Sequence, residues 1–311
     1  MSVLIIKFFI FTIFHRIKLH FKPVAFFFLA LLGFRRWGDF FNAIEDSKNL
    51  SIPSITKTLY FNLRCLPYQQ AKMVPVYVYP HTRLQKLSGR LEIDGMISTG
   101  MIKLGRDWGF RCQGETRFRI EGLLLFHGKC EILRGSDICV FPNGKLTLGD
   151  NVLIAENALI YCMDSIVIGN STRITYETNI FDTDFHYTID IDKREIKKMT
   201  SPIDIGNYVW IGNRTNIKKG VKIPDYTIVA ASGSLLTKDY TEIVPRFGCL
   251  GGYPARVLPA RSCRTWKNEL ERIKTLNTWF ANHINSNTYK IGEDEDIEDF
   301  TGITISDNAS K

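Results

Sequence analysis

The chain has 311 residues, of which 45% are hydrophobic, so it is long enough for one large or two ordinary domains and is not a disordered protein. Its 40 Lys and Arg against 32 Asp and Glu favour an anionic partner, such as a phosphate-bearing cofactor, a membrane surface or an acidic glycan. We expect no nucleic-acid partner, because no basic stripe interleaved with aromatic residues and no zinc-finger signature accompanies this charge.

The seven cysteines are odd in number and lack the short paired spacing of zinc sites. Reduced thiols that pack as small apolar side chains are the simplest interpretation. We therefore expect a cytoplasmic protein without a metal ion.

Two apolar runs, at residues 3–14 and 24–34, are separated and flanked by Lys and Arg. Each run is shorter than the roughly 20 residues that a transmembrane helix needs. Residues 1–60 are expected to form an apolar, basic and helical segment, in which residues 1–40 contact the inner face of a membrane as an interfacial anchor. Packing of these runs against the body or a partner subunit is an equal alternative.

Aliphatic residues recur at every sixth position from residue 148 onward, with a two-residue slip between Ile160 and Ile168. The register is Leu148, Ile154, Ile160, Ile168, Ile174, Ile180, Ile205, Ile211, Ile217, Ile223 and Val229. A period of six matches neither a helix nor a single strand, so it predicts one short strand and one corner per repeat, with the aliphatic side chain inside. Three such sides close one coil. Gly212 and Gly220 are among the glycines that mark corners, where the backbone needs a positive φ or a close approach.

The register predicts a mainly β chain with a coil domain over residues 61–258. Its irregular first coils fall in residues 91–138, where Ile102, Ile132 and Ile138 keep partial register. The register breaks once, and the basic stretch over residues 187–204 is expected to leave the coils as an excursion loop. That loop carries Lys193, Arg194, Lys197 and Lys198.

Beyond the coils, Pro254 and Pro259 are expected to end the sheet. Helical spacing over residues 264–284 predicts a C-terminal helix within a segment at 259–290. Its apolar face, with Trp266, Leu270, Ile273, Leu276 and Phe280, is expected to pack onto the coils. Residues 291–311 form an acidic tail that we expect to be disordered.

His186 falls where the next inward aliphatic residue is expected. A buried imidazole without a partner costs a few kcal/mol, so we expect it at the mouth of the coil, where the chain departs into the loop. An imidazole has an ordinary pKa of about 6.5 and suits a general base at that place. Asp182 and Asp184 are its neighbours; either one orients the ring, or both cap the corner.

The segments 208–213, 218–221, 233–239 and 251–257 resemble the C-terminal coils of hexapeptide-repeat acetyltransferases. The resemblance covers residues 148–257 and is greatest to the branch that O-acetylates sugars of bacterial surface polysaccharides. It implies a left-handed β-helix, a homotrimer with active sites between subunits, and acetyl-CoA in the groove between adjacent prisms.

The resemblance assigns roles to individual positions. It makes His186 the base and places Trp210 in the lining of the site. The positions that match cofactor contacts are Asn213, Ala231, Ser232, Thr237, Lys238 and Arg256. Lys238 and Arg256 are the leading candidates to neutralise the coenzyme phosphates, whereas Lys218, Lys219 and Lys222 are interpreted as a solvated face.

The predicted function is transfer of an acetyl group from acetyl-CoA to a hydroxyl of a surface polysaccharide or its sugar precursor, directly in a ternary complex. N-acetylation of an amino sugar and a non-catalytic trimeric scaffold are the alternatives. A zinc hydrolase on the same fold needs three histidine ligands, and the coils from residue 91 onward offer only His127 and His186.

Overall fold

The computed structural model describes residues 52–109, 114–292 and 295–302. The apolar runs at 3–14 and 24–34 lie outside the described residues, so their contact with a membrane stays a prediction. None of the helices in these described ranges is long and apolar enough to cross a membrane.

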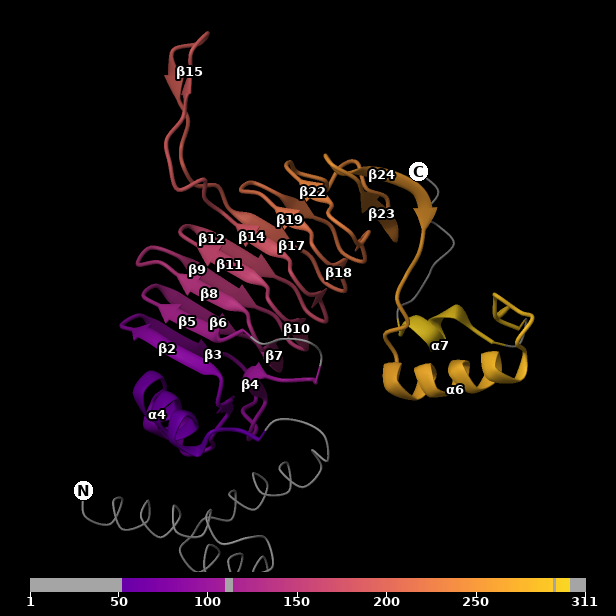
Figure 1. Cartoon of the computed structure of the whole chain (residues 1–311), viewed down its shortest axis with the longest axis horizontal. Coiled ribbons are helices and arrows are strands. Elements are labelled where there is room, and N and C mark those ends of the chain that lie inside the picture. Colours follow the sequence, from indigo (N-terminus) through magenta and orange to yellow (C-terminus); the bar gives the residue numbers. More distant parts are fainter. Residues whose placement is uncertain (1–51, 110–113, 293–294, 303–311) are drawn as a thin grey trace, which may run out of the picture.

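Three sheets, parallel except at the last strand, form the body of the molecule, and along most of the chain successive strands join the three sheets in turn (Figure 1). Sheet A contains β1 (Val76–Val78), β4 (Ile102–Arg106), β7 (Cys130–Leu133), β10 (Val152–Ile154), β13 (Arg173–Ile174), β18 (Trp210–Ile211), β21 (Ile228–Val229), β23 (Gly248–Gly251) and β24 (Arg256–Arg261). Sheet B contains β2 (Thr82–Leu87), β5 (Thr116–Ile120), β8 (Asp137–Val140), β11 (Leu159–Cys162), β14 (Asn179–Phe181), β19 (Asn216–Ile217) and β22 (Leu235–Leu236). Sheet C contains β3 (Arg90–Ile93), β6 (Leu123–Phe126), β9 (Lys145–Leu148), β12 (Ser165–Ile168), β17 (Ile203–Ile205) and β20 (Lys222–Ile223). The predicted fold class, a mainly β chain wound into a three-sided parallel β-helix, is confirmed.

The predicted aliphatic register forms the core. All eleven of its residues are at most 2% exposed. In sheet C, for example, Leu148 pairs with Ile168 and Ile168 with Ile205, so each inward residue stacks on its equivalent in the next coil. Because a single coil has no closed core of its own, this stacking is what makes neighbouring coils depend on one another.

The corners bring the backbones of adjacent coils close together. A Cβ atom at Gly212 would lie 2.4 Å from the nitrogen of Ala231 in the next coil, which leaves no room for a side chain. Gly220 instead has a φ of +78°, a left-handed conformation that favours glycine. Both reasons expected from the sequence for corner glycines therefore occur.

Two short helices cover the first coil, α4 (Ile55–Cys65) and α5 (Tyr68–Ala71). The side chain of Ser54 caps α4 by accepting from the main-chain amide of Lys57. Asn62, buried on the inner face of α4, donates to the carbonyl of Val76 at 2.7 Å and accepts from its amide at 3.2 Å. The main-chain carbonyl and amide of Val76 in the first strand thereby have hydrogen-bond partners at the end of the stack.

The sequence predicted that the sheet ends at Pro254, but the sheet continues beyond this residue. β24 follows and pairs antiparallel with β23, and the register shifts between Gly248 and Cys249. Pro259 is tolerated for two reasons. β24 is the edge strand of sheet A, and Pro259 falls within the irregularity, where it has no pairing partner in β23 and need not donate a hydrogen bond.

The predicted C-terminal helix is present as α6 (Glu269–Asn282), but its expected packing onto the coils holds only for Trp266, which precedes α6 and lies edge-on to Tyr208. The helix has no buried residue, Leu270 is 77% exposed, and Figure 1 shows α6 standing away from the coils. Its inner contacts are instead with the segment after it, where Trp279 lies edge-on to Tyr289. Amphipathic spacing predicted the helix correctly but did not specify its partner.

The acidic tail also departs from the expectation of disorder. Residues 297–301 form α7 (Ile297–Thr301), capped by the side chain of Asp296 and followed by Gly302 in the left-handed conformation. Phe300 is buried, and the guanidinium of Arg272 lies 3.9 Å from its ring centroid. Phe300 thus packs against α6, and Arg272 also donates to the carbonyl of Asp299 at 3.2 Å.

The described cysteines are free thiols, namely Cys65, Cys130, Cys139, Cys162, Cys249 and Cys263. Cys112 lies outside the described residues. Burial raises the pKa of Cys139 to about 11, so this thiol stays protonated at neutral pH. This agrees with the interpretation of the cysteines as small packing residues.

Candidate active site

The candidate site surrounds the place where the chain leaves the coils. We name the turns by the sheets they join, so the B–C corner leads from a strand of sheet B to the next strand of sheet C. Between β14 and β17 this corner is replaced by a long hairpin, here called the excursion hairpin (residues 182–202), which contains β15 (Ile189–Asp190) and β16 (Glu195–Ile196). Figure 1 shows it projecting far from the body.

Main-chain contacts close the root of the excursion hairpin. Thr183 and Thr200 form an antiparallel bridge. The amide of Asp184 donates to the carbonyl of Met199 at 3.1 Å, and the amide of Ser201 donates to the carbonyl of Asp182 at 2.9 Å. The two ends of the hairpin are therefore held side by side where they leave the coil.

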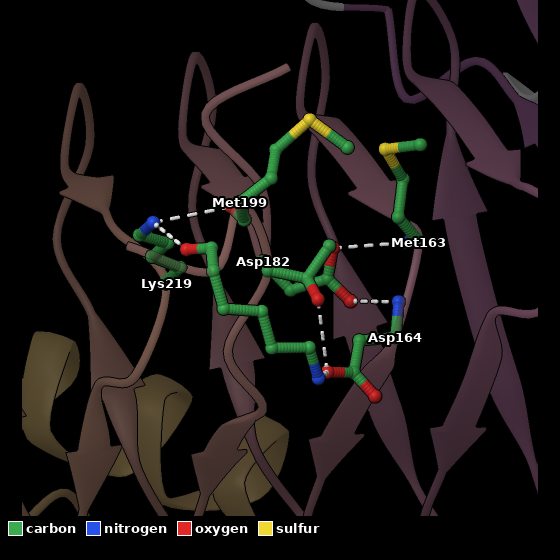
Figure 2. A network of polar contacts seen from close by, with 7 residues as sticks. Met163, Asp164, Asp182, Met199 and Lys219 are labelled. Carbon is green, nitrogen blue, oxygen red and sulfur yellow. Dashed lines mark hydrogen bonds and ion pairs between the residues drawn. The ribbon is translucent and has the colours of Figure 1, made fainter. Parts of the chain in front are cut away.

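Asp182 occupies the first position of the root and is fully buried. Its two carboxylate oxygens accept the main-chain amides of Met163 and Asp164, each at 2.8 Å, as Figure 2 shows. Burial raises the pKa of the Asp182 carboxyl, and these two amides partly offset that effect. Asp182 therefore stabilises the contact with the preceding coil, which is the capping role that the sequence left open.

Asp184 points to a different partner. Its Oδ2 atom lies 2.6 Å from Nζ of Lys219, a residue of the next B–C corner. Within the described part of the chain, neither Asp182 nor Asp184 forms a hydrogen bond with His186. Both carboxylates are close to the predicted base in sequence. In the structure, however, their side chains interact with other residues.

Phe185 fixes the backbone immediately before His186. Its φ is +60°, and its amide donates to Oγ1 of Thr183 at 3.0 Å. Its ring meets the rings of Tyr161 and Phe181 edge-on, with centroids 6.0 and 6.2 Å away. Phe185 thereby packs on the outer face of sheet B, and His186, which follows it, is exposed to solvent.

Three of the predicted cofactor contacts lie together at another corner. Asn213 follows β18 in the A–B corner, and Ala231 and Ser232 follow β21 one coil later. The amide of Ser232 donates to the carbonyl of Asn213 at 3.0 Å. These residues form a continuous edge of the prism.

Thr237 and Lys238 follow β22 and lie in the B–C corner, on the same edge as His186. The ammonium of Lys238 lies 5.7 Å from the ring centroid of Tyr240. Arg256 lies on the edge strand β24 opposite Gly251, and its side chain is exposed. Both predicted phosphate-binding cations are therefore accessible.

Trp210 lies on the outer face of sheet A and is 37% exposed. The guanidinium of Arg264 is 5.4 Å from its ring centroid. Arg173, in the adjacent strand, has its pKa lowered by burial and by the charge of Arg264. Sequence reasoning missed these two arginines, because only the register of sheet A and the return of the chain after β24 bring them beside Trp210.

Lys219 was also missed, since the sequence interpretation assigned it to a solvated face with Lys218 and Lys222. Its side chain is only 23% exposed, and it contacts the root of the excursion hairpin. Lys222 is instead paired with Asp239 at 2.9 Å. The three lysines carry the same charge, so the sequence could not show which of them contacts the excursion hairpin.

The predicted site residues fall into two groups within one chain. His186, Thr237 and Lys238 lie along the B–C corners, whereas Asn213 and the residues that follow β21 lie along the A–B corners. Sheet B separates these two edges. One prism therefore does not bring the predicted base and all of the predicted cofactor contacts together.

Comparison with known proteins bears on the family that the chain resembles. No protein-family model matches the chain. The galactoside O-acetyltransferase of Escherichia coli (strain K12) is 31% identical over 122 residues, which are 39% of this chain and 47% of that enzyme. The putative colanic acid biosynthesis acetyltransferase WcaF of the same strain is 28% identical over 193 residues, which are 57% of this chain and 98% of that protein.

Among solved structures, the polySia specific acetyltransferase NeuO is 18% identical, with a TM-score of 0.35 over 65% of this chain and 99% of its own. The chain thus spans about half the length of the first sequence relative and nearly all of the second. Both sequence relatives are named as acetyltransferases, so the resemblance predicted from residues 148–257 is confirmed. The chain is homologous to enzymes that transfer acyl groups.

Proposed function

We propose that this chain is an acetyl-CoA-dependent O-acetyltransferase that acts on a sugar hydroxyl, with His186 as the general base. The observation that carries the proposal is the place of His186. It is the exposed imidazole at the root of the excursion hairpin, in a chain whose relatives in sequence are acetyltransferases.

The reaction needs little machinery, because a thioester is already activated. The sugar hydroxyl attacks the carbonyl carbon while the imidazole of His186 accepts its proton, which gives a tetrahedral oxyanion and an imidazolium. The oxyanion then collapses, the carbon–sulfur bond breaks, and the imidazolium returns the proton to the departing thiolate. Such a base contributes about 10² to 10⁴ in rate.

Transfer is direct in this mechanism, since no residue of the chain carries the acetyl group between donor and acceptor. Main-chain amides along the groove supply the donors for the oxyanion. Lys238 and Arg256, both exposed, supply positive charge for the phosphates of the coenzyme. The guanidinium of Arg264 lies over the ring of Trp210 on the outer face of sheet A, and we propose that this pair lines the coenzyme site.

We further propose that the protein is a homotrimer with one active site at each interface. The support is the division of the predicted residues between two edges of the prism, the B–C edge with His186 and the A–B edge with Asn213. Threefold packing of prisms sets one edge of each subunit against the other edge of its neighbour. Sedimentation equilibrium should give three times the chain mass of 35.7 kDa, and a stable monomer with full activity would refute the shared site.

The acceptor is proposed to be a sugar of a surface polysaccharide or its precursor, and the excursion hairpin is proposed to bind it. Lys193, Arg194 and Lys197 are exposed on the hairpin and favour an anionic saccharide or a diphosphate-linked sugar. Lys198 instead forms an ion pair with Asp164, in which Nζ and Oδ2 lie 3.0 Å apart. Replacing the three exposed cations by alanine should raise the KM for the acceptor far more than the KM for acetyl-CoA. Equal effects on both would remove this role.

Membrane contact through residues 1–40 belongs to the same proposal, because a lipid-linked precursor is presented at the membrane surface. The full chain should float with anionic vesicles and remain unbound with neutral ones. Failure to bind either kind of vesicle would leave packing against the body or a partner subunit as the role of these residues.

The function is tested by incubating the purified chain with acetyl-CoA and a panel of neutral, anionic and amino sugars, and measuring thiol release. Mass spectrometry and NMR of the product then assign the acetyl group to oxygen or nitrogen. An ester product supports the proposal, whereas an amide product favours the N-acetyltransferase alternative. Absence of release with every acceptor, from a protein that forms the trimer, would favour the scaffold alternative.

A further inference from the structure

Lys219 joins the two chain segments that form the root of the excursion hairpin. Its Nζ atom contacts Oδ2 of Asp184 on the outgoing segment at 2.6 Å. The same atom donates to the carbonyls of Lys198 at 2.7 Å and of Met199 at 3.2 Å on the returning segment. Figure 2 shows this amine directed at the main chain at the end of the hairpin.

These contacts use the full donor capacity of the ammonium group. A lysine amine has three N–H donors and no acceptor, and Lys219 has three acceptors within hydrogen-bond distance. The side chain is 23% exposed, so its interactions are less screened by water than those of a surface ion pair. By contrast, the side chain of Lys198, which pairs with Asp164 in the preceding coil, is 73% exposed.

The position of Lys219 in the fold explains why it acts on the hairpin. It lies in the B–C corner of the coil that follows the hairpin, and the adjacent amide of Gly220 donates to the carbonyl of Ser201 at 3.1 Å. The next coil therefore supplies a rigid support from which one long side chain reaches both segments. Asp184 lies two residues before His186, and Phe185, which separates them, is seated on sheet B.

We propose that Lys219 is a positioning residue for the transfer reaction, which sets the spacing of the two hairpin segments and thereby holds His186 at the groove. This inference rests on the proposed function. Lys219 does not touch the reacting atoms in this account; it acts through Asp184 and the main chain. A displacement of the base by about 1 Å is enough to cost up to a hundredfold in rate.

The first test compares Lys219→Met with the wild type, using Lys218→Met as the matched control. Lys218 is exposed, and its side chain has no hydrogen bond or ion pair with the described residues, so its variant removes the same charge one position away. For Lys219→Met we expect kcat to fall about ten- to hundredfold with the KM for acetyl-CoA changed less than about threefold. Lys219→Arg should recover part of kcat, because it keeps the charge and the reach. A kcat for Lys219→Met equal to that of Lys218→Met would overturn the inference.

A double-mutant cycle separates positioning from direct action of Asp184 on the imidazole. If Lys219 acts through the ion pair, then Asp184→Asn and the double variant should both resemble Lys219→Met, so that the effects on kcat are clearly less than multiplicative. Independent, multiplicative effects would show that Asp184 and Lys219 act separately, and the proposed route would be wrong.

Hydrogen exchange gives a readout that does not depend on activity. The amides of Asp184 and Ser201 close the hairpin root, and we expect them to exchange at least about tenfold faster in Lys219→Met than in Lys218→Met. Unchanged exchange would contradict the anchoring role, even for a protein that releases no coenzyme A. If these amides exchange faster in Lys219→Met but the wild-type chain has no transferase activity, the anchoring role stands and the proposed function is removed instead.

Discussion

The carboxylate of Asp182 accepts the main-chain amide of Asp164 at 2.8 Å, and its other oxygen accepts the amide of Met163 at the same distance. Asp182 belongs to the coil from which the excursion hairpin leaves, whereas Met163 and Asp164 form the corner of the coil before it. One buried side chain therefore ties the root of the hairpin to the stack beneath it.

Asp182→Asn should destabilise the protein by about 1–3 kcal/mol, because an amide nitrogen would face one of two buried N–H donors that now share a carboxylate. Urea unfolding followed by circular dichroism measures this loss. Asp150→Asn is the matched control, since Asp150 accepts the amide of Lys129 at 2.7 Å in an exposed corner. A loss for Asp182→Asn no greater than that of the control would contradict the structural role.

Gly212→Ala should destabilise the stack by about 1–3 kcal/mol, because the new Cβ would lie 2.5 Å from Cα of Ala231 and backbone atoms cannot move aside as a side chain can. Thermal unfolding is the measurement. Gly292→Ala provides the comparison, since its nearest neighbour is the flexible side chain of Glu295 at 3.6 Å. Equal melting temperatures for the two variants would argue against the tight A–B corner.

Asp239 is expected to titrate well below an ordinary carboxyl. Hydrogen bonds from Lys222 and Thr241 lower its pKa from 3.8 to about 2. Because the folded pKa is the lower one, the stability from this group is present above pH 3.8 and is lost as the pH falls towards 2. NMR titration of the Asp239 carboxyl should show its pKa rising towards the ordinary value in Lys222→Met and staying low in Lys218→Met. A pKa unchanged by Lys222→Met would exclude the ion pair as its cause.

The sequence allowed the repeat region to be predicted almost residue by residue. Ile180 and Ile217 are in the predicted register and pair across sheet B, because a period of six returns the aliphatic residue to the inside of each side. The direction of the aliphatic side chain is a local property of the strand, so spacing alone determines it. Spacing alone would place His186 at an inward position, and the cost of burying an unpaired imidazole placed it outside the core, where the structure finds it.

The contacts of the hairpin root could not be predicted in this way. Asp182 and Asp184 both flank the same imidazole in sequence, and only the stacking of coils shows that one faces the preceding corner while the other faces Lys219. The C-terminal helix fails for a related reason. An apolar stripe at Leu270 and Ile273 predicts a buried face, but it carries no information about which surface covers it.

The most direct test of the central claim is thiol release by His186→Ala with saturating acetyl-CoA and the best acceptor found for the wild type. His127→Ala is the matched control, because His127 lies in an earlier coil, 3.3 Å from Asp94 and far along the stack from the excursion hairpin. The account predicts that His186→Ala loses at least about a hundredfold in kcat while His127→Ala retains wild-type turnover. Turnover by His186→Ala at the rate of the wild type would show that another group removes the proton, and the assignment of the base would be wrong.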